Sequence, residues 1–458
     1  MKLTRREALA GATAAALGGA GVYELVDRLT GSAPARTAGT RPPEQHLLDS
    51  LAVIEDDGVE VLVPPLHHQL VTATVRAGDP RMSARELEDA LQELERRYDP
   101  TPAGLGITVA WGLPYFERHV PGAWQRHAPY DRRARKPALL PARRFPSDPD
   151  ETILERNEVA VLLRSDSSDH LADGARTLFQ DLRVFEPTSI RRGFIGGGFG
   201  GRPSLPKKVA VAAGVAGADL IPDTAQLFLG FTSTQKAGLG PRRIANFETL
   251  GYIDLGPQGY FHQGTHMHVS HVLENLEAWY LNFDFQERVD TAFRPGLQVR
   301  SDVQTVPQGP QQIEHDAQVK RDFRDTGRIG HSSAIQTTSR LQRDVVGDDG
   351  THYPKGTAIP QRADFNTLDN PFTWSSDPRR DGLQTTPAAG IHFVVFNPSS
   401  DDFHRNRLAM DGVLPDGTRL PLPARARGQG FNSILRTTHR QNFLVPPRRH
   451  RSFPLAEL

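Results

Sequence analysis

Apolar positions in the first half of the chain recur with two periods, one typical of strands and one typical of amphipathic helices. Apolar or alternating runs, bounded by glycine or charged residues, predict strands at Leu70–Val75, Leu105–Trp111 and Val159–Arg164. Apolar residues every three or four positions predict two helices, one that starts at the capping box Ser83-Ala84-Arg85-Glu86 and one over Asp169–Leu182. This order of strands and helices predicts a ferredoxin-like unit with an antiparallel sheet.

The second half of the chain repeats this plan. Strands are expected at Tyr252–Leu255, His266–Val272 and Ile391–Phe396, and a helix is expected directly after the second of them. The stretch Asp344–Asp381 has little periodicity, which predicts a long loop that is functional or wraps a ligand. The Pro- and Arg-rich stretch Arg436–Pro454 predicts a tail that packs over the surface or reaches a neighbouring subunit. The expected fold class is therefore α+β, with two ferredoxin-like halves and antiparallel sheets.

Length and composition narrow the class of protein. A chain of 458 residues suits two domains, which we expect over residues 44–240 and 241–458. The 54 basic and 54 acidic side chains give a formal net charge of zero, so the overall field favours no nucleic-acid partner. The chain has no cysteine, which excludes disulfides, zinc–thiolate sites, iron–sulfur clusters and cysteine nucleophiles.

The N-terminus has the layout of a removable export signal. Arg5-Arg6 precedes a weakly apolar run, rich in Ala and Gly, that ends near Val22, and Ser32-Ala33-Pro34-Ala35 follows. The paired arginines indicate the twin-arginine export machinery as a partner. The alternative is an N-terminal anchor helix, but the run is short for a bilayer span and contains several glycines. We therefore expect residues 1–43 to be a twin-arginine signal peptide and linker, and the protein to be extracellular or in the periplasm or cell envelope.

Several segments together resemble the dye-decolorizing peroxidase (DyP) family, and the resemblance covers nearly the whole mature chain. The segments are Gly104–Gly112, Leu227–Thr234 at the place of that family's GFxDG signature, Gly264–Val269 with Leu276–Trp279, and His331–Ile335. Their order and spacing carry the resemblance, since no one motif is specific alone. The family's fold is a dimeric α+β barrel of two ferredoxin-like halves with haem in the second half. The resemblance leaves a homo-oligomer open.

The resemblance implies a site that holds haem b (protoporphyrin IX iron). His331 stands at the position of the iron ligand, and an acidic partner makes such an imidazole more basic; Asp401 is the candidate for that partner. Arg362 follows at the place of the distal arginine that polarises bound peroxide, although an exposed loop arginine beside Asp364 is the competing interpretation. Phe231 and Thr232, in the GFxDG-like segment, are expected beside the cofactor. The implied substrates are hydrogen peroxide and small organic reductants.

Ser233 is the main departure from the family's pattern. It takes the position of the GFxDG aspartate, which carries the peroxide proton as a general acid–base. A hydroxyl can hydrogen-bond peroxide or a water, but it does not accept a proton near neutral pH. Peroxidase turnover is therefore expected to be slow, with Ser233 orienting the ligand. The alternative function is a haem-binding carrier or sensor without peroxidase turnover.

Other patterns suggest different chemistry. His262, His266, His268 and His271 lie on or beside one predicted strand, where alternation puts His266 and His268 on one face, so a haem-free protein with a copper or zinc site is a further alternative. The run Gly196–Gly201 satisfies GxGxxG, but Arg202-Pro203 follows it in place of a helix, so a dinucleotide site is not expected. The chain has no GxSxG elbow for Ser-His-Asp hydrolase chemistry.

Overall fold

The structure is a computed structural model. It describes residues 21–30, 41–56, 59–196, 204–223, 225–231, 243–244, 259–297, 315–346, 350, 352–370 and 386–458. The predicted strand at Tyr252–Leu255 and the site candidates Thr232 and Ser233 lie outside these residues.

The N-terminal half is a ferredoxin-like unit. Its strands pair antiparallel in the order β9-β3-β8-β4, and one helix follows β3 and another follows β8. The elements are β3 (His67–Val75), α3 (Pro80–Arg97), β4 (Gly106–Gly112), β8 (Val159–Ser165), α6 (Ser168–Arg176) and β9 (Phe185–Phe194). A π-helical turn, Thr177–Asp181, extends α6. These elements confirm the strand and helix predictions for this half.

The start of α3 differs from the prediction. The helix buries Leu87, Leu91 and Leu94, as the apolar spacing predicts. It begins at Pro80, however, and the side chain of Asp79 caps it by accepting from the backbone N–H of Arg81. Proline at the first helical position is favourable because it has no N–H to leave unsatisfied. The aspartate–proline pair therefore sets the boundary, and the predicted capping box at Ser83 was wrong.

The C-terminal half repeats the plan around longer insertions. The strands run in the order β17-β11-β16, and β14 and β15 both pair with the far side of β16, all antiparallel. The strands are β11 (Thr265–Glu274), β14 (Gln361–Arg362), β15 (Phe365–Thr367), β16 (Gly390–Asn397) and β17 (Leu435–Val445). The helices are α8 (Leu276–Asn282), α9 (Phe285–Ala292), α10 (Asp316–Thr326), α11 (His331–Ser339) and α12 (Ser400–Met410).

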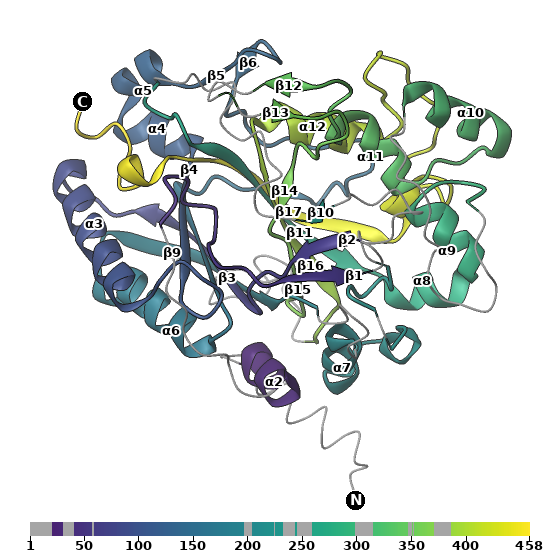
Figure 1. Ribbon diagram of the computed structural model, residues 1–458, viewed down its shortest axis with the longest axis horizontal. Helices are drawn as coiled ribbons and strands as arrows, with labels where there is room; N and C mark the ends of the chain where they lie inside the picture. Colours follow the sequence, from purple (N-terminus) through teal and green to yellow (C-terminus); the bar gives the residue numbers. More distant parts are fainter. Residues whose placement is uncertain are drawn as a thin grey trace, which may run out of the picture.

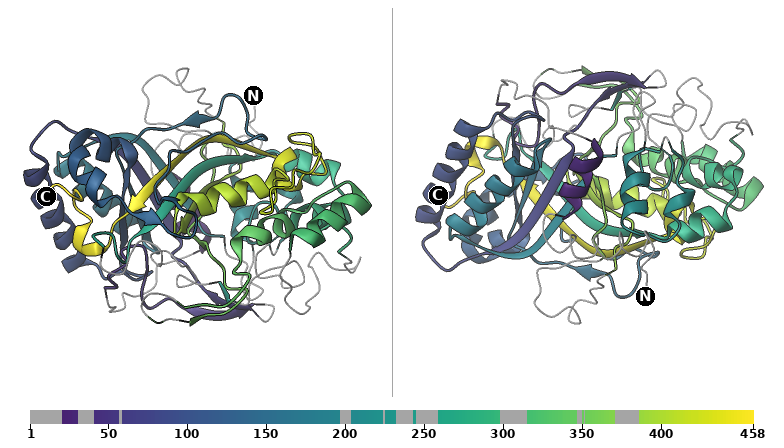
Figure 2. Two further views of the ribbon diagram at one scale, coloured as in Figure 1. Left: turned by 90° about the horizontal axis from the view of Figure 1, so that it is seen from above. Right: turned by 90° about the horizontal axis from the view of Figure 1, so that it is seen from below.

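The two half-sheets close into one barrel. On one side β4 pairs with β17 through Trp111 and Leu444, and on the other side β9 pairs with β15 through Phe194 and Asn366. Helices α3 and α6 lie on one flank of the barrel and α8 to α11 on the opposite flank (Figures 1 and 2). The barrel interior is filled by an apolar cluster that includes Leu70, Leu162, Met267, Val269, Val394, Phe396 and Phe443. The predicted α+β fold with two ferredoxin-like halves is confirmed.

Two predictions for the second half were wrong. The stretch expected as a surface tail, Arg436–Pro454, contains most of β17, which pairs with β11 and with β4. Its first residues are polar, and the buried His439, Arg440, Gln441 and Asn442 hide the strand pattern. The stretch Asp344–Asp381, expected to be a loop, holds β14 and β15 and the hairpin of β12 (Val345–Val346) and β13 (His352–Tyr353).

Shorter elements surround the barrel. A small sheet joins β1 (Val53–Asp56), β2 (Val59–Leu62) and β10 (Arg243–Ile244). The remaining strands are β5 (Tyr130–Asp131), β6 (Lys136–Pro137) and β7 (Ile153–Leu154), and the remaining α-helices are α2 (Gly21–Thr30), α4 (Leu113–His119), α5 (Pro121–His127) and α7 (Leu205–Ala212). Among the described residues, short 3₁₀ turns span Ala218–Leu220, Gly430–Ser433 and Arg448–His450.

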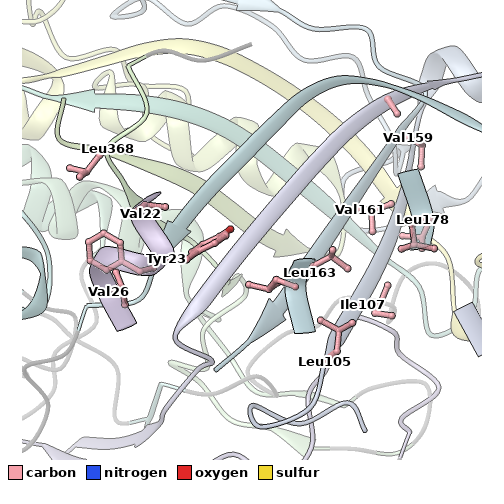
Figure 3. Close-up of a cluster of buried hydrophobic side chains, with 14 of the residues drawn as sticks. Val22, Tyr23, Val26, Leu105, Ile107, Val159, Val161, Leu163, Leu178 and Leu368 are labelled. Atoms are coloured by element: carbon pink, nitrogen blue, oxygen red, sulfur yellow. The ribbon is translucent and has the colours of Figure 1, made fainter. Parts of the chain in front are cut away.

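Helix α2 packs against the barrel, within the stretch that we expected to stand apart from the fold. Val22, Tyr23 and Val26 are buried against α7 and β9, with Leu368 in the same cluster (Figure 3). The Tyr23 hydroxyl donates to the backbone carbonyl of His68 at 2.5 Å. The assignment of residues 1–43 to a signal peptide and linker, and the boundary between residues 240 and 241, stay predictions. None of the helices in the described residues has the length and apolar character needed to cross a membrane.

Candidate active site

Helix α11 begins in close contact with the backbone of Phe293. A Cβ atom on Gly330, the residue before the helix, would lie 2.2 Å from the carbonyl oxygen of Phe293. That same oxygen accepts a hydrogen bond of 2.9 Å from the backbone N–H of Ser333. Only glycine allows this approach, because every other residue brings a Cβ into the gap. The Gly330-His331 sequence therefore fixes where the first residue of α11 lies.

His331 is that first residue, and its imidazole borders a small cavity. The cavity is a narrow crevice with no room for a water-sized molecule, and it is lined by Ile329, Gly330, His331, Ala334, Met410, Gln429, Gly430 and Phe431. The His331 and Phe431 rings lie 4.7 Å apart between centroids. The ring atom Nδ1 is buried and has no hydrogen-bond partner among the described residues. Burial, and then the positive charges of Arg362 and Arg407, lower the pKa of His331 to about 3. The imidazole is therefore neutral at physiological pH.

Asp401 pairs with two cations in the structure, and its role as the carboxylate partner of His331 stays a prediction. Lys136 Nζ contacts its Oδ1 at 2.5 Å, and Arg405 Nε contacts its Oδ2 at 3.0 Å. The neighbouring Asp402 closes the capping box of α12 with Ser399 and pairs with Arg133 at 2.7 Å. Carboxylates are stabilised in the first turn of a helix. Both aspartates are therefore used to start α12 and to hold the segment around residues 133–136 on it.

Sequence reasoning missed a buried ion network behind the cavity. Arg407 Nη1 contacts Asp411 Oδ1 at 3.0 Å, and Asp148 pairs with Arg440 at 2.6 Å with both side chains 1% exposed. Asp411 also accepts a 3.0 Å hydrogen bond from Asn432. Because Met410 and Gln429 border the cavity and flank these groups in sequence, the network holds the cavity wall in place. The four-residue spacing of Arg407 and Asp411 on a helix is the signal that could have revealed it.

Arg362 lies within electrostatic range of His331, as its effect on the pKa of His331 shows. It occupies β14 opposite Val395 of β16. Its side chain is 43% exposed, and its Nε lies 3.6 Å from Asp364 Oδ1. The structure thus contains both the ion pair with Asp364 and the proximity to His331. The distal role of Arg362 stays a prediction.

Phe231, in the GFxDG-like segment, packs against Phe293 near the start of α11. It is buried, and its ring lies 5.0 Å from the ring of Phe293, the residue whose backbone receives α11. Helix α8 fixes the preceding residues. Trp279 Nε1 donates to the Leu229 carbonyl at 2.9 Å, and the Tyr280 hydroxyl donates to the Phe228 carbonyl at 2.7 Å. Phe231, the last described residue of this segment, therefore packs against the residue whose carbonyl receives α11.

The histidines of β11 do not form a metal site. His266 and His268 lie on the face of β11 opposite to Met267 and Val269, which belong to the barrel interior. His268 is bonded to Asn442 and Ser270, and His271 contacts Thr438. Across the described ranges, no three His, Asp or Glu side chains are grouped so that they could hold a metal ion. The alternative of a metal site in this cluster was therefore wrong.

His331 is the residue that would hold a haem iron, because a neutral imidazole offers a lone pair to iron. The buried Nδ1 of His331 has no hydrogen-bond partner among the described residues, so a bond to this atom would be favourable. The crevice beside His331 has no room even for a water-sized molecule, whereas typical ligand pockets measure roughly 300–1,000 Å³. A porphyrin therefore needs more room than this cavity alone supplies.

Comparisons with known proteins support the fold. Residues 65–447 match a family model described as "Family of unknown function (DUF7405)". No curated protein matches the sequence. Two variants of DypB from Rhodococcus jostii, each in complex with heme, match with TM-scores of 0.50 and 12% identity over 85% of this chain and 96% of theirs. A DyP-type peroxidase from Cellulomonas bogoriensis matches at 19% identity with a TM-score of 0.49, over 89% of this chain and 96% of its own.

At such low identity the structural likeness establishes the fold alone. The family match covers both ferredoxin-like halves, from the start of β3 to the end of β17. The chain therefore belongs to the family of unknown function DUF7405 and has the fold of the DyP-type peroxidases.

Proposed function

We propose that this protein is a haem-dependent, peroxidase-like oxidoreductase that uses hydrogen peroxide to oxidise small organic substrates. The observation that carries the proposal is His331: a partly buried, neutral imidazole whose buried Nδ1 has no hydrogen-bond partner within the described part of the chain, and which lies within electrostatic range of Arg362. Haem b, when bound, would supply the electrons and the iron that the cleavage of a peroxide O–O bond needs. The DyP-type fold supports the proposal because its solved relatives include proteins in complex with heme.

The chain's own residues have distinct roles in this proposal. His331 donates the lone pair of a ring nitrogen and stays unprotonated at physiological pH because burial lowers its pKa. The Arg362 guanidinium donates hydrogen bonds to peroxide and stabilises the negative charge that develops on the leaving oxygen. Ser233 orients the peroxide by hydrogen bonding, and Phe231 and Thr232 border the cofactor. Organic reductants then return the electrons, and the protein is exported by the twin-arginine route.

A second candidate is a haem-binding carrier or sensor without peroxidase turnover. Serine at position 233 favours it, because the GFxDG-like segment then lacks its proton acceptor. The two candidates share the ligand His331 and differ in the fate of peroxide.

Absorbance first tests whether His331 binds haem, which both candidates require. Titration of the purified protein with haem should give an intense Soret band that His331→Ala abolishes and that the exposed control His127→Ala keeps. No Soret band in the wild type would refute both candidates. Rapid mixing of the haem-loaded protein with hydrogen peroxide then separates them, because only a peroxidase shows spectral changes that an organic reductant reverses with turnover.

A further inference from the structure

The β9–β15 seam, where the two half-sheets meet on one side of the barrel, is shorter than the β4–β17 seam on the other side. Among the described residues, Phe194 and Asn366 are its register pair, whereas two residue pairs join β4 to β17. Side chains add bonds across the β9–β15 seam. The Thr367 hydroxyl donates to the Arg192 carbonyl at 2.7 Å, and the Arg192 backbone N–H donates to Asp369 Oδ2 at 3.2 Å. Because a short strand ladder leaves backbone groups that neighbouring elements have to cover, this seam depends on what packs over it.

Three strands come into close contact at this seam. A Cβ atom on Gly193 of β9 would lie 2.0 Å from the Asn366 carbonyl oxygen and 2.6 Å from the ring of Phe365, both of β15. His68 of β3 is the register partner of Gly193, and its ring stacks on that of Phe365 at 5.1 Å between centroids. A shift of any one of these strands therefore disturbs the other two.

Helix α2 packs onto the first-half side of this seam. The Tyr23 hydroxyl donates to the His68 carbonyl at 2.5 Å, and the Tyr23 ring lies edge-on to that of His67 at 5.1 Å between centroids. Val22 and Val26 are buried, and the helix lies against β9 and α7 (Figure 3). N-terminal segments are ordered where they are tied down. Here a buried hydrogen bond and apolar packing both tie α2 to the strands of the seam.

The sequence of α2 has the pattern of a helix that docks on a protein surface. Val22, Val26 and Leu29 have the spacing of one helical face, i, i+4 and i+7, and three of the ten residues are charged. A removable signal needs small residues before its cleavage point, as at Ser32–Ala35, but it needs no such face. The pattern therefore favours a structural helix over a spacer that is discarded.

We propose that α2 is a brace over the β9–β15 seam and remains in the working protein, so that removal of the N-terminal segment stops before Gly21. A cut after Ala35 would take away the hydrogen bond to His68 and leave the apolar surface under Val26 open to water. The brace goes beyond the proposed function, since it needs neither haem nor turnover.

Hydrogen exchange, measured by mass spectrometry on the full chain, tests the brace. Val26→Asp puts a charge on the buried face of α2, and the matched control Val211→Asp makes the same change at a 43% exposed position of the neighbouring α7. Burial of an unpaired charge is costly, so Val26→Asp should speed exchange in peptides of the β9–β15 seam by more than about tenfold. The β4–β17 seam should keep its wild-type rate, and Val211→Asp should leave both seams unchanged.

Tyr23→Phe provides a milder variant that decides the matter if Val26→Asp does not fold. It keeps the ring and removes one hydrogen bond, so exchange at the β9–β15 seam should rise by about 2- to 10-fold. Tyr130→Phe, at a 51% exposed tyrosine, is its control and should exchange as the wild type does. Wild-type exchange at the seam in both Val26→Asp and Tyr23→Phe would overturn the brace.

The retention of α2 is tested by cutting the chain behind it. A full chain that carries a site-specific protease sequence in place of Ser32–Ala35 is folded, cut and passed over a size-exclusion column under native conditions. The N-terminal piece should elute with the rest of the protein, and it should separate when Val26→Asp is added. Separation of the piece without that substitution would overturn the inference, whether or not the protein is exported. Exported protein should have a mass that includes Gly21, and a mature chain that starts at Arg36 would contradict retention.

Discussion

The absence of a side chain at Gly330 decides where the imidazole of His331 lies. The position has an ordinary backbone conformation, with φ of −87°, so conformational freedom is not the reason for glycine. The reason is space, since a Cβ would lie 2.2 Å from the Phe293 carbonyl oxygen and 2.6 Å from the Cα of Arg294. Both neighbours are backbone atoms, which cannot move aside as the end of a flexible side chain can.

Gly330→Ala should therefore displace the start of α11. We expect a loss of about 1–3 kcal/mol in the free energy of unfolding, the usual cost of overpacking, and a weaker Soret band per haem added. Denaturant unfolding and haem titration measure the two effects. Gly122→Ala is the matched control, because the nearest atom to its Cβ would be the end of the Arg126 side chain at 3.8 Å. Equal behaviour of the two variants would show that contact with Phe293 does not position His331.

Single residues were predictable from the sequence only where a motif placed them. His331 follows from the resemblance, and in the structure its imidazole is partly buried and neutral. Asp401 was chosen by its place after a strand, and the sequence does not show that Lys136, more than 200 positions earlier, engages its carboxylate. Burial raises the pKa of Glu274. No sequence motif marks this residue, because the burial exists only once the barrel is closed.

At the scale of elements, α8 fixes the segment that leads into position 233. The hydroxyl of Tyr280 and the indole N–H of Trp279 hold two consecutive carbonyls, those of Phe228 and Leu229. Both donors come from one turn of α8, so the segment follows that helix closely. Apolar packing adds to this, because Phe231 contacts Phe285 of α9 at 6.1 Å between ring centroids.

Tyr280→Phe tests whether the hydrogen bond from Tyr280 positions this segment or only stabilises the fold. It removes one hydrogen bond, with an expected cost of about 0.5–1.5 kcal/mol in the free energy of unfolding. If the segment positions Ser233, the rate of reaction with peroxide should fall by a larger factor than the change in the free energy of unfolding accounts for. Stopped-flow rates beside denaturant unfolding measure both, and Tyr130→Phe, at a 51% exposed tyrosine, is the control. A peroxide rate equal to that of the control would exclude the positioning role.

The elements that the sequence failed to predict share one physical cause. Strands β4, β8 and β16 are largely apolar because both of their faces are covered, so their composition predicts them. Strand β17 is equally buried, but several of its buried side chains are polar and find partners within the fold, such as Arg440 with Asp148. Hydropathy cannot distinguish a polar strand with internal partners from an exposed tail.

At the scale of the whole molecule, the folded chain surrounds several histidines that stay neutral. Burial lowers the pKa of His46, His266 and His331 to about 3 and that of His404 to about 4. Burial likewise lowers the pKa of His68, His268, His271 and His392 well below its usual value. The β4–β17 and β9–β15 pairs close the two half-sheets into one barrel. Protonation of the buried histidines therefore indicates that the folded structure has opened.

These histidines predict a protein that loses stability in mild acid. In the unfolded chain each imidazole binds a proton near pH 6.5, whereas in the folded chain it stays neutral, so the unfolded state binds more protons below that pH. The free energy of unfolding should therefore fall as the pH drops from 6.5 towards 3. At pH 5 the upper limit is about 2 kcal/mol for each histidine. Carboxyl groups whose pKa is raised, such as Glu274 and Asp369, act in the opposite direction but are fewer.

His46 offers the sharpest test of this acid sensitivity. The residue is fully buried, neither ring nitrogen has a hydrogen-bond partner among the described residues, and its ring packs 4.9 Å from that of Phe396. His46→Met keeps an apolar contact and removes one group that can take up a proton on unfolding. The slope of the unfolding free energy against pH near 5.5 should then decrease by close to one proton, about 1.2 kcal/mol per pH unit. Exposed His127→Met should leave the slope at its wild-type value. An unchanged slope in His46→Met would mean that this end of the barrel opens to water before the rest of the molecule unfolds.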